Sequence, residues 1–111
     1  MKSLNSIVTI TFCTFLLSTA SFAQAENAFT NEVKDITTKY DSIWDSNKET
    51  IVFTGSSSVR LWRKLEQEFP NHQIVNSGFG GSQASDLLLF TDELILSYNP
   101  KKVFIYEGDN D

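Results

Sequence analysis

Apolar residues recur along much of this chain at spacings of three and four, which is the period of an amphipathic helix. One such stripe predicts a helix over 29–44, and a second predicts a helix over 61–69 that ends before Pro70. A third and very apolar run predicts a helix over 87–96, which is stopped by Pro100. We expect the aromatic residues of these stripes to belong to the core.

Three short runs of β-branched and aromatic residues alternate with these helices, at 50–54, 73–76 and 103–106. They are apolar at successive positions, which is typical of strands buried on both faces of a parallel sheet. This order of elements, joined by short right-handed crossovers, predicts a three-layer α/β/α fold of the flavodoxin-like kind. We expect a single domain, and an incomplete one, because three strands are few for such a sheet.

The N-terminal segment has the features of a secretory signal peptide. Lys2 precedes a short apolar stretch over 7–17, and small residues lead to an exit at Ala23. The stretch is shorter than the about 20 apolar residues that span a membrane, and it lacks the amphipathic stripe of a buried helix. We therefore predict a signal peptide over 1–23 and a secreted or periplasmic bacterial domain over 24–111, without a stable membrane anchor.

Composition excludes several kinds of chemistry. The single cysteine, Cys13, falls in the predicted signal peptide, so the mature chain offers no disulfide, thiol chemistry or cysteine-rich zinc site. The formal net charge of −5 argues against a nucleic-acid partner, which would require a basic face. We expect the few clustered basic residues to be solvated: Arg60, Arg63, Lys64, Lys101 and Lys102.

Each predicted strand runs into a small, polar and flexible turn. The turns lie at 55–58, 78–82 and 108–111. In a parallel sheet they would share the carboxyl edge, where open α/β folds bind their ligands. A serine of the first turn could simply cap the helix that follows. A phosphate loop is not expected there, because no Gly-Lys-Ser/Thr follows Ser58.

The residues and the order of the three turns resemble the sequence blocks of the SGNH (GDSL-type) hydrolase superfamily. The resemblance extends over about 51–111 and implies a domain of the SGNH hydrolase type. It implies Ser57 as the nucleophile, in a Gly-Ser-Ser sequence where the family usually has Gly-Asp-Ser. It also implies that the Gly81 amide and the Asn110 side chain stabilise the oxyanion. No cofactor is implied, and the third block accounts better than a metal site for the nearby acids Glu107, Asp109 and Asp111.

The sequence provides no general base for this serine chemistry. A serine attacks an ester carbonyl only when a base takes its proton. The family supplies that base from an Asp-x-x-His block, and the chain ends before any such block. The sole histidine, His72, precedes a strand and should lie about 16 Å from Ser57, the length of a strand of five residues. A base must approach within about 3 Å, so His72 is not expected to be catalytic.

Three functions therefore compete. The first is an exported serine ester hydrolase represented by its N-terminal part, with small-molecule, carbohydrate or lipid esters as substrates and with little activity in these 111 residues alone. The second is an inactive remnant or small binding module that retains an oxyanion-like pocket. The third is a phosphate or flavin binder that uses the same turns, which the acidic charge and the lack of a phosphate motif disfavour.

Overall fold

The computed structural model describes residues 28–111, so the predicted signal peptide over 1–23 lies outside the described residues. Contacts divide the chain into two compact units, 1–31 and 32–111. The described part of the first unit is the opening turn of a helix over 28–41, which continues into the second unit. Every other described element belongs to residues 32–111. Within the described residues no helix is both long and apolar enough to cross a membrane.

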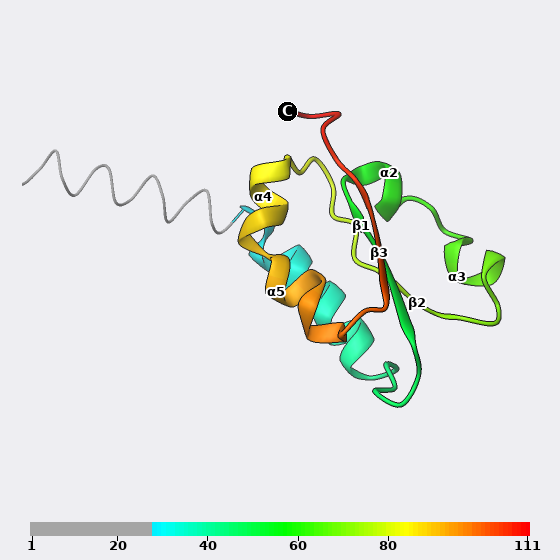
Figure 1. Ribbon diagram of the computed structural model, residues 1–111. Helices are drawn as coiled ribbons and strands as arrows, with labels where there is room; N and C mark the ends of the chain where they lie inside the picture. The colour runs from blue at the N-terminus through cyan, green and yellow to red at the C-terminus, as the bar shows by residue number, and fades with distance from the viewer. Residues whose placement is uncertain (1–27) are drawn as a thin grey trace, which may run out of the picture. The chain divides into compact units, whose positions relative to one another are not determined.

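A parallel sheet forms the centre of the second unit (Figure 1). Its strands are β1 (Thr50–Gly55), β2 (Gln73–Asn76) and β3 (Lys102–Tyr106), in the order β2-β1-β3. The first residue of β1, Thr50, pairs with Gln73 at the start of β2. The strands therefore begin together along one edge of the sheet and end together along the opposite edge, which is the carboxyl edge. The predicted α/β class and the parallel sheet are confirmed.

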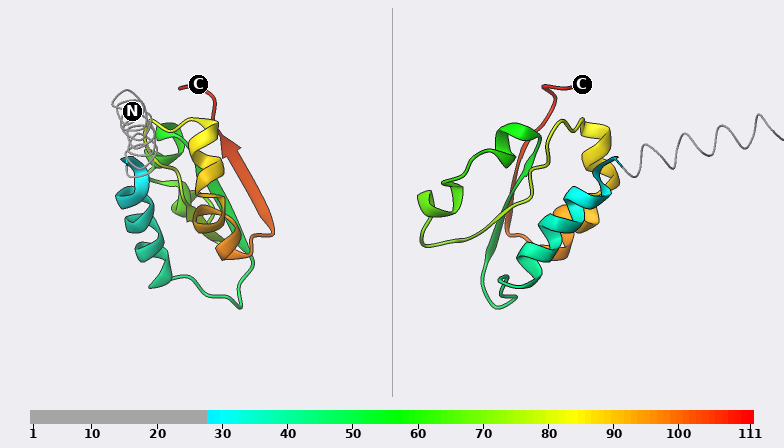
Figure 2. Two further views of the ribbon diagram at one scale, coloured as in Figure 1. Left: turned by 90° about the vertical axis from the view of Figure 1, so that its left-hand side faces the viewer. Right: turned by 180° about the vertical axis from the view of Figure 1, so that it is seen from behind.

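Helices cover both faces of this sheet (Figures 1 and 2). The N-terminal helix, α4 (Ala84–Leu89) and α5 (Thr91–Leu94) lie on one side, and α2 (Ser57–Arg60) and α3 (Leu65–Glu68) lie on the other. A short 3₁₀ turn, η1 (Leu96–Tyr98), leads into β3. Because helices lie over both faces of β1, Val52 and Thr54, which point to one face, and Phe53, which points to the other, are all buried.

The predicted helix over 61–69 is wrong as a single element. The structure has two short helices, α2 and α3, separated by an irregular segment at 61–64. Tertiary contacts account for the break, because the Trp62 ring leaves the helical path and packs edge-on against Phe53 with centroids 5.8 Å apart. Its indole nitrogen also donates a hydrogen bond to the Glu68 carboxylate over 3.1 Å.

The predicted helix over 87–96 is also divided, between α4, α5 and η1. Phe90 separates the first two with φ −109° and ψ 21°, and its ring packs edge-on against buried Phe79. Thr91 Oγ1 lies 3.1 Å from the Leu87 carbonyl oxygen, a bond from a side chain to the preceding turn that is associated with helix bending. The break leaves Leu88 76% exposed and Leu89 66% exposed.

Each face of the sheet has its own packed layer. On the side of α2 and α3, buried Phe53, Val59, Leu65 and Ile74 form a cluster, with Ile51 and Phe69 packed against it. On the other side the buried apolar residues come from the N-terminal helix, α4, α5 and the segments beside them: Val33, Tyr40, Phe79, Leu87, Leu94, Ile95 and Tyr98. Both layers rest on β1, which makes it the central support of the fold.

The edge strand β3 differs from the expectation that all three strands are buried. Every one of its residues is exposed, and Val103, Phe104, Ile105 and Tyr106 range from 38% to 59%. No strand in the described residues pairs with its outer edge. Phe104 stacks on Phe53 at 4.8 Å, beside an open, largely apolar cavity of about 380 Å³. The sequence pattern of β3 therefore matches a covered strand, whereas this structure leaves it uncovered.

We predict that the chain self-associates through β3, because an exposed apolar edge strand pairs readily with other chains. Ile105→Lys places a charge on this edge and should weaken self-association about tenfold or more, measured by analytical ultracentrifugation over a concentration series. Ile43→Lys is the matched control, since Ile43 is 61% exposed but lies outside the sheet. A monodisperse monomer at all concentrations would contradict the prediction.

Candidate active site

Backbone hydrogen bonds bring the three polar turns to one edge of the sheet. The Ser56 amide donates to the Tyr106 carbonyl over 3.1 Å, which joins the first turn to the end of β3. The Phe79 amide donates to the Gly55 carbonyl over 2.9 Å, which joins the second turn to the end of β1. Figure 1 shows the C-terminal segment at the same end of the sheet as the beginnings of α2 and α4. The predicted convergence of the turns is confirmed.

Glycine is required where the first turn leaves β1. Gly55 has φ +136°, and a Cβ built on it would lie 1.9 Å from the Tyr106 carbonyl oxygen. Any side chain at this position would separate β1 from β3. The backbone next reaches Ser56, which is 1% exposed and occupies the N-cap position of α2. Its Oγ makes no capping bond and has no hydrogen-bond partner among the described residues, so helix capping by Ser56 does not explain this serine.

Ser57 is the first residue of α2 and is partly exposed. The first amides of a helix have no acceptor within the helix and remain able to bind an anionic oxygen. At Ser57 a hydroxyl and such an amide belong to the same residue. Ser58, which follows, is exposed and lines the apolar cavity beside β3. Nothing in the structure assigns a catalytic role to Ser57, and that role stays a prediction.

Gly81 lies in the second turn in the left-handed region, with φ +72°. A Cβ built on it would have no heavy atom within 4 Å, so the surrounding protein leaves space for a side chain. The structural requirement for glycine here is therefore conformational, because an L-residue is strained at this φ. Gly81 is exposed at the site edge, as an oxyanion donor must be. Its predicted contact with substrate is untested.

The third turn is bound to the second by side-chain contacts. Asn110 Nδ2 donates to the Ser82 carbonyl over 3.0 Å, and Gln83 Nε2 donates to the Asn110 carbonyl over 2.7 Å. Asp111 Oδ1 accepts from the Ala84 amide over 3.0 Å. A carboxamide nitrogen carries two hydrogens, and the bond to Ser82 uses one of them. The structure thus fixes the Asn110 amide beside the turn that carries Gly81.

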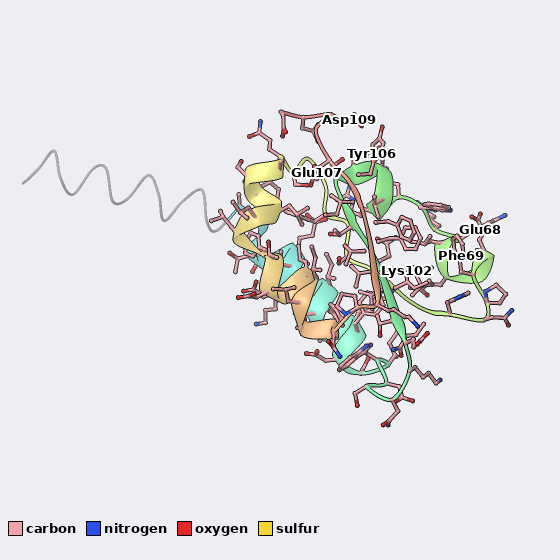
Figure 3. The ribbon with its side chains drawn as sticks, viewed as in Figure 1. Glu68, Phe69, Lys102, Tyr106, Glu107 and Asp109 are labelled. Carbon is pink, nitrogen blue, oxygen red and sulfur yellow. The ribbon has the colours of Figure 1, made fainter. Side chains whose placement is uncertain are left out.

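Glu107 supports this junction from the end of β3 (Figure 3). Its Oε1 lies 2.7 Å from the Oγ of Ser82, which is fully buried, and Ser82 Oγ also lies 3.0 Å from the Phe79 carbonyl. Glu107 Oε2 is buried and has no hydrogen-bond partner among the described residues. The acidic residues near this turn do not assemble further, because no described group of three His, Cys, Asp or Glu residues could hold a metal ion.

His72 lies where the sequence predicts it. It immediately precedes β2, whose first residue pairs with the first residue of β1, so it stands at the edge opposite the three turns. Its side chain is exposed and lines a surface cavity with Lys48 and Glu49. No other histidine is present in the sequence, so the described residues contain no histidine able to act on Ser57.

Sequence reasoning missed one residue that contacts the site loop. Glu32, on the N-terminal helix, accepts hydrogen bonds at Oε1 from the Gly80 amide over 3.0 Å and from Arg60 Nη1 over 3.1 Å. Arg60 is exposed, as expected, and it also forms an ion pair with Glu32. Glu32 lies 48 residues before Gly80, and no motif links the two positions.

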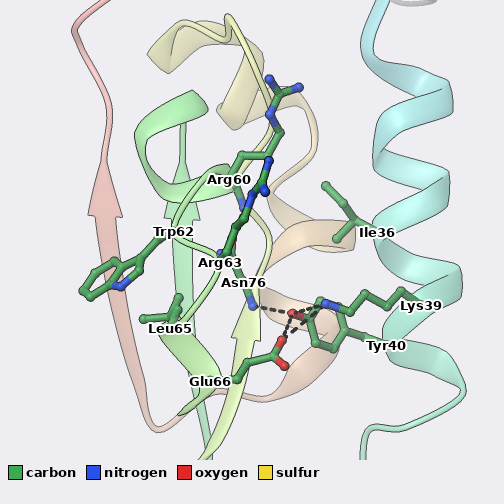
Figure 4. A pocket seen from close by; sticks show the side chains of 10 residues that line it. Ile36, Lys39, Tyr40, Arg60, Trp62, Arg63, Leu65, Glu66 and Asn76 are labelled. Carbon is green, nitrogen blue, oxygen red and sulfur yellow. Dashed lines mark hydrogen bonds and ion pairs between the residues drawn. The ribbon is translucent and has the colours of Figure 1, made fainter. Parts of the chain in front are cut away.

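A polar cavity of about 250 Å³ lies between the N-terminal helix and the segment that joins α2 to α3 (Figure 4). Tyr40 lines this cavity, and its hydroxyl donates a hydrogen bond to the Glu66 carboxylate over 2.8 Å and accepts one from the Asn76 amide over 2.9 Å. Burial is the main cause that raises the pKa of Tyr40 well above its ordinary range, and the Glu66 carboxylate adds to it. This contact ties the helix to β2 and to α3.

Other shifted groups lie away from the three turns. Burial raises the pKa of Tyr98, next to the start of β3, to about 12. At the surface, a hydrogen bond from Lys101 lowers the pKa of Glu49, which immediately precedes β1. Both groups lie near the starts of strands, away from the three turns.

Comparison with known proteins gives structural matches but no sequence match. No family model matches the chain, and no curated protein does. The fold is similar to a solved structure from Streptococcus pneumonia that is provisionally described as a platelet activating factor, with a TM-score of 0.56 and 28% sequence identity. The match covers 84% of this chain but 44% of that one, so the chain spans less than half of the length of the protein it resembles.

The two glycines should respond differently to substitution by alanine. Gly81→Ala meets only the left-handed backbone penalty and should lower the free energy of unfolding by about 1–2 kcal/mol. Gly55→Ala also forces a Cβ into the Tyr106 carbonyl, and the loss should exceed about 4 kcal/mol or prevent folding. Urea unfolding followed by circular dichroism measures both values. Equal losses would show that the contact between Gly55 and Tyr106 is not a constraint.

Proposed function

We propose that this chain carries the nucleophile and the oxyanion-stabilising part of an exported serine ester hydrolase of the SGNH type. The observation that supports this most strongly is the hydrogen-bonded convergence of the three turns at the carboxyl edge of a parallel sheet. The Streptococcus match supports a relation to a larger protein of the same fold. Export rests on the predicted signal peptide alone.

In this proposal Ser57 Oγ attacks the carbonyl carbon of an ester, and its proton passes to a general base. The carbonyl oxygen gains negative charge and is stabilised by the amides of Ser57 and Gly81 and by Asn110 Nδ2. Collapse of the tetrahedral intermediate expels the alcohol and leaves an acyl-enzyme, which water then hydrolyses to the acid. Acyl esters of lipids and acetyl esters of carbohydrates are the substrate classes that we propose.

The preorganisation of Asn110 favours this role. A donor stabilises a developing oxyanion best when it is already fixed before reaction, because no reorganisation is then required during the chemical step. The bond from Nδ2 to Ser82 fixes the carboxamide plane, and its second hydrogen stays available. Gly81, one residue before Ser82, shares the same loop. Two of the proposed donors are therefore coupled through Ser82.

One observation favours the alternative of an inactive remnant or binding module. The only histidine lies at the edge of the sheet where the strands begin, far from Ser57, so the described residues provide no histidine base. When a catalytic triad loses members, the oxyanion donors and substrate binding still accelerate the reaction about 10³–10⁴-fold relative to the reaction in water. We therefore propose feeble hydrolysis at most by these residues alone, with the general base supplied from the Asp-x-x-His block expected of the family.

A fluorophosphonate probe tests the nucleophile in the chain itself. Attack by Ser57 forms an oxygen–phosphorus bond and releases fluoride, and the serine proton passes to hydroxide, because the described residues provide no histidine base. Labelling is therefore expected to be slow, and a long incubation at mildly alkaline pH should give one covalent adduct per chain at Ser57 by peptide mass spectrometry. Ser57→Ala should abolish the adduct, whereas Ser58→Ala, at the next and more exposed serine, should leave it. Labelling that survives Ser57→Ala, or no labelling at high probe concentration, would favour the inactive alternative.

Asn110→Ala tests the oxyanion role. It removes one donor and should lower kcat for ester hydrolysis by about 10²–10³, the usual loss for a single oxyanion-hole donor. The measurement requires a gene product long enough to include the expected Asp-x-x-His block. Asn71→Ala is the control, because Asn71 is exposed in the loop before β2 at the opposite edge. Unchanged turnover in Asn110→Ala would reject the role.

A further inference from the structure

The turn that carries Gly81 is held from outside the three sequence blocks. Glu32 Oε1 accepts one hydrogen bond from the Gly80 amide and a second from the Arg60 guanidinium, over 3.0 and 3.1 Å. Gly80 is the residue immediately before Gly81, and Arg60 is the last residue of the helix that begins with Ser57. A single carboxylate oxygen therefore joins the loop of one proposed oxyanion donor to the helix of another.

Close packing of glycines reinforces this connection. A Cβ built on Gly80 would lie 2.4 Å from Arg60 Nη1, so the guanidinium lies directly against the loop. A Cβ built on Gly78 would lie 2.5 Å from the Arg60 backbone nitrogen. The loop thus rests on α2 at two positions. Glycine at both positions permits the contact, and the carboxylate of Glu32 holds it in place.

Because the ion pair between Arg60 and Glu32 is partly exposed, a positioning effect of Glu32 can be measured separately from an effect on stability. The side chains of Arg60 and Glu32 are 46% and 30% exposed, and ion pairs this exposed contribute little to the free energy of unfolding. The bond to the Gly80 amide is different, because it fixes the direction of a backbone group one peptide before the Gly81 amide. Misplacement of a reacting or stabilising group by about 1 Å can cost on the order of 10² in rate.

We propose that Glu32 is a positioning residue that holds the Gly81 amide in place relative to Ser57. Glu32 acts through Gly80 and Arg60 and touches no reacting atom. The proposal rests on the proposed function, because it assigns no activity of its own. It makes the N-terminal helix part of the site architecture, although the helix contributes none of the proposed catalytic groups.

The first readout is the rate constant for fluorophosphonate labelling of Ser57. Glu32→Ala should lower it about tenfold or more, because the Gly81 amide loses its fixed direction. Glu32→Gln keeps one acceptor oxygen for the Gly80 amide and should restore labelling to within about threefold of the original rate. Asp35→Ala is the control, since Asp35 is an exposed acid on the same helix. The urea midpoints of Glu32→Ala and Asp35→Ala should remain close to that of the unsubstituted chain.

The second readout does not depend on activity. Hydrogen exchange measured by NMR should be accelerated about tenfold or more at the Gly80 amide in Glu32→Ala, with faster exchange at Gly81 as well. Amides of β1 should keep their protection, and Asp35→Ala should change neither glycine. If the unsubstituted chain is never labelled, the proposed function fails, and this exchange pattern alone then decides on the positioning role.

Three results would overturn the proposal. One is exchange at Gly80 and Gly81 that is the same in Glu32→Ala and in the unsubstituted chain. Another is an unchanged labelling rate in Glu32→Ala despite faster exchange, because the loop would then move without consequence for Ser57. Reduced labelling in Glu32→Ala that Glu32→Gln does not rescue would also contradict it, since the acceptor oxygen is the feature on which the positioning depends.

Discussion

The rest of the site depends on the close approach of the Tyr106 carbonyl to Gly55. No residue with a Cβ fits between these two strands at this point, and the missing side chain allows the Ser56 amide to bond the Tyr106 carbonyl. This bond sets the end of β3 beside the start of α2. The turn that follows β3 then reaches the second turn, where Asn110 bonds the carbonyl of Ser82. Gly55 thus determines whether the three turns lie side by side at the carboxyl edge of the sheet.

The sequence was sufficient to predict the sheet but not the division of the helices. Strands and turns follow from local patterns, and their convergence follows from parallel topology, because all carboxyl ends of parallel strands meet at one edge. Helix breaks follow from contacts between distant residues. Trp62 leaves its helix to reach Phe53, and Phe90 interrupts another beside Phe79. An apolar stripe indicates which residues are to be buried, but it does not indicate which distant residue an aromatic ring packs against.

The exposure of β3 shows a second limit of pattern reading. Its continuous apolar residues predict burial on both faces, and the structure leaves all five positions exposed. The pattern correctly predicted a parallel strand, and the structure pairs it with β1. Burial is different, because it depends on neighbours that the strand's own residues do not contain. The same argument applies to Leu88 and Leu89 on α4, which are apolar and exposed.

Glu32 marks the part of the site that no motif could predict. The three turns are recognisable because they combine glycine with small polar residues after strands, whereas Glu32 is an ordinary acid on a helix surface. Its importance comes from geometry alone, since one oxygen meets both Gly80 and Arg60. A catalytic base requires the same kind of long-range placement, and His72 cannot provide it from the opposite edge. In the proposed site, motifs supply the groups that would meet a substrate, and a distant helix would determine how precisely those groups are held.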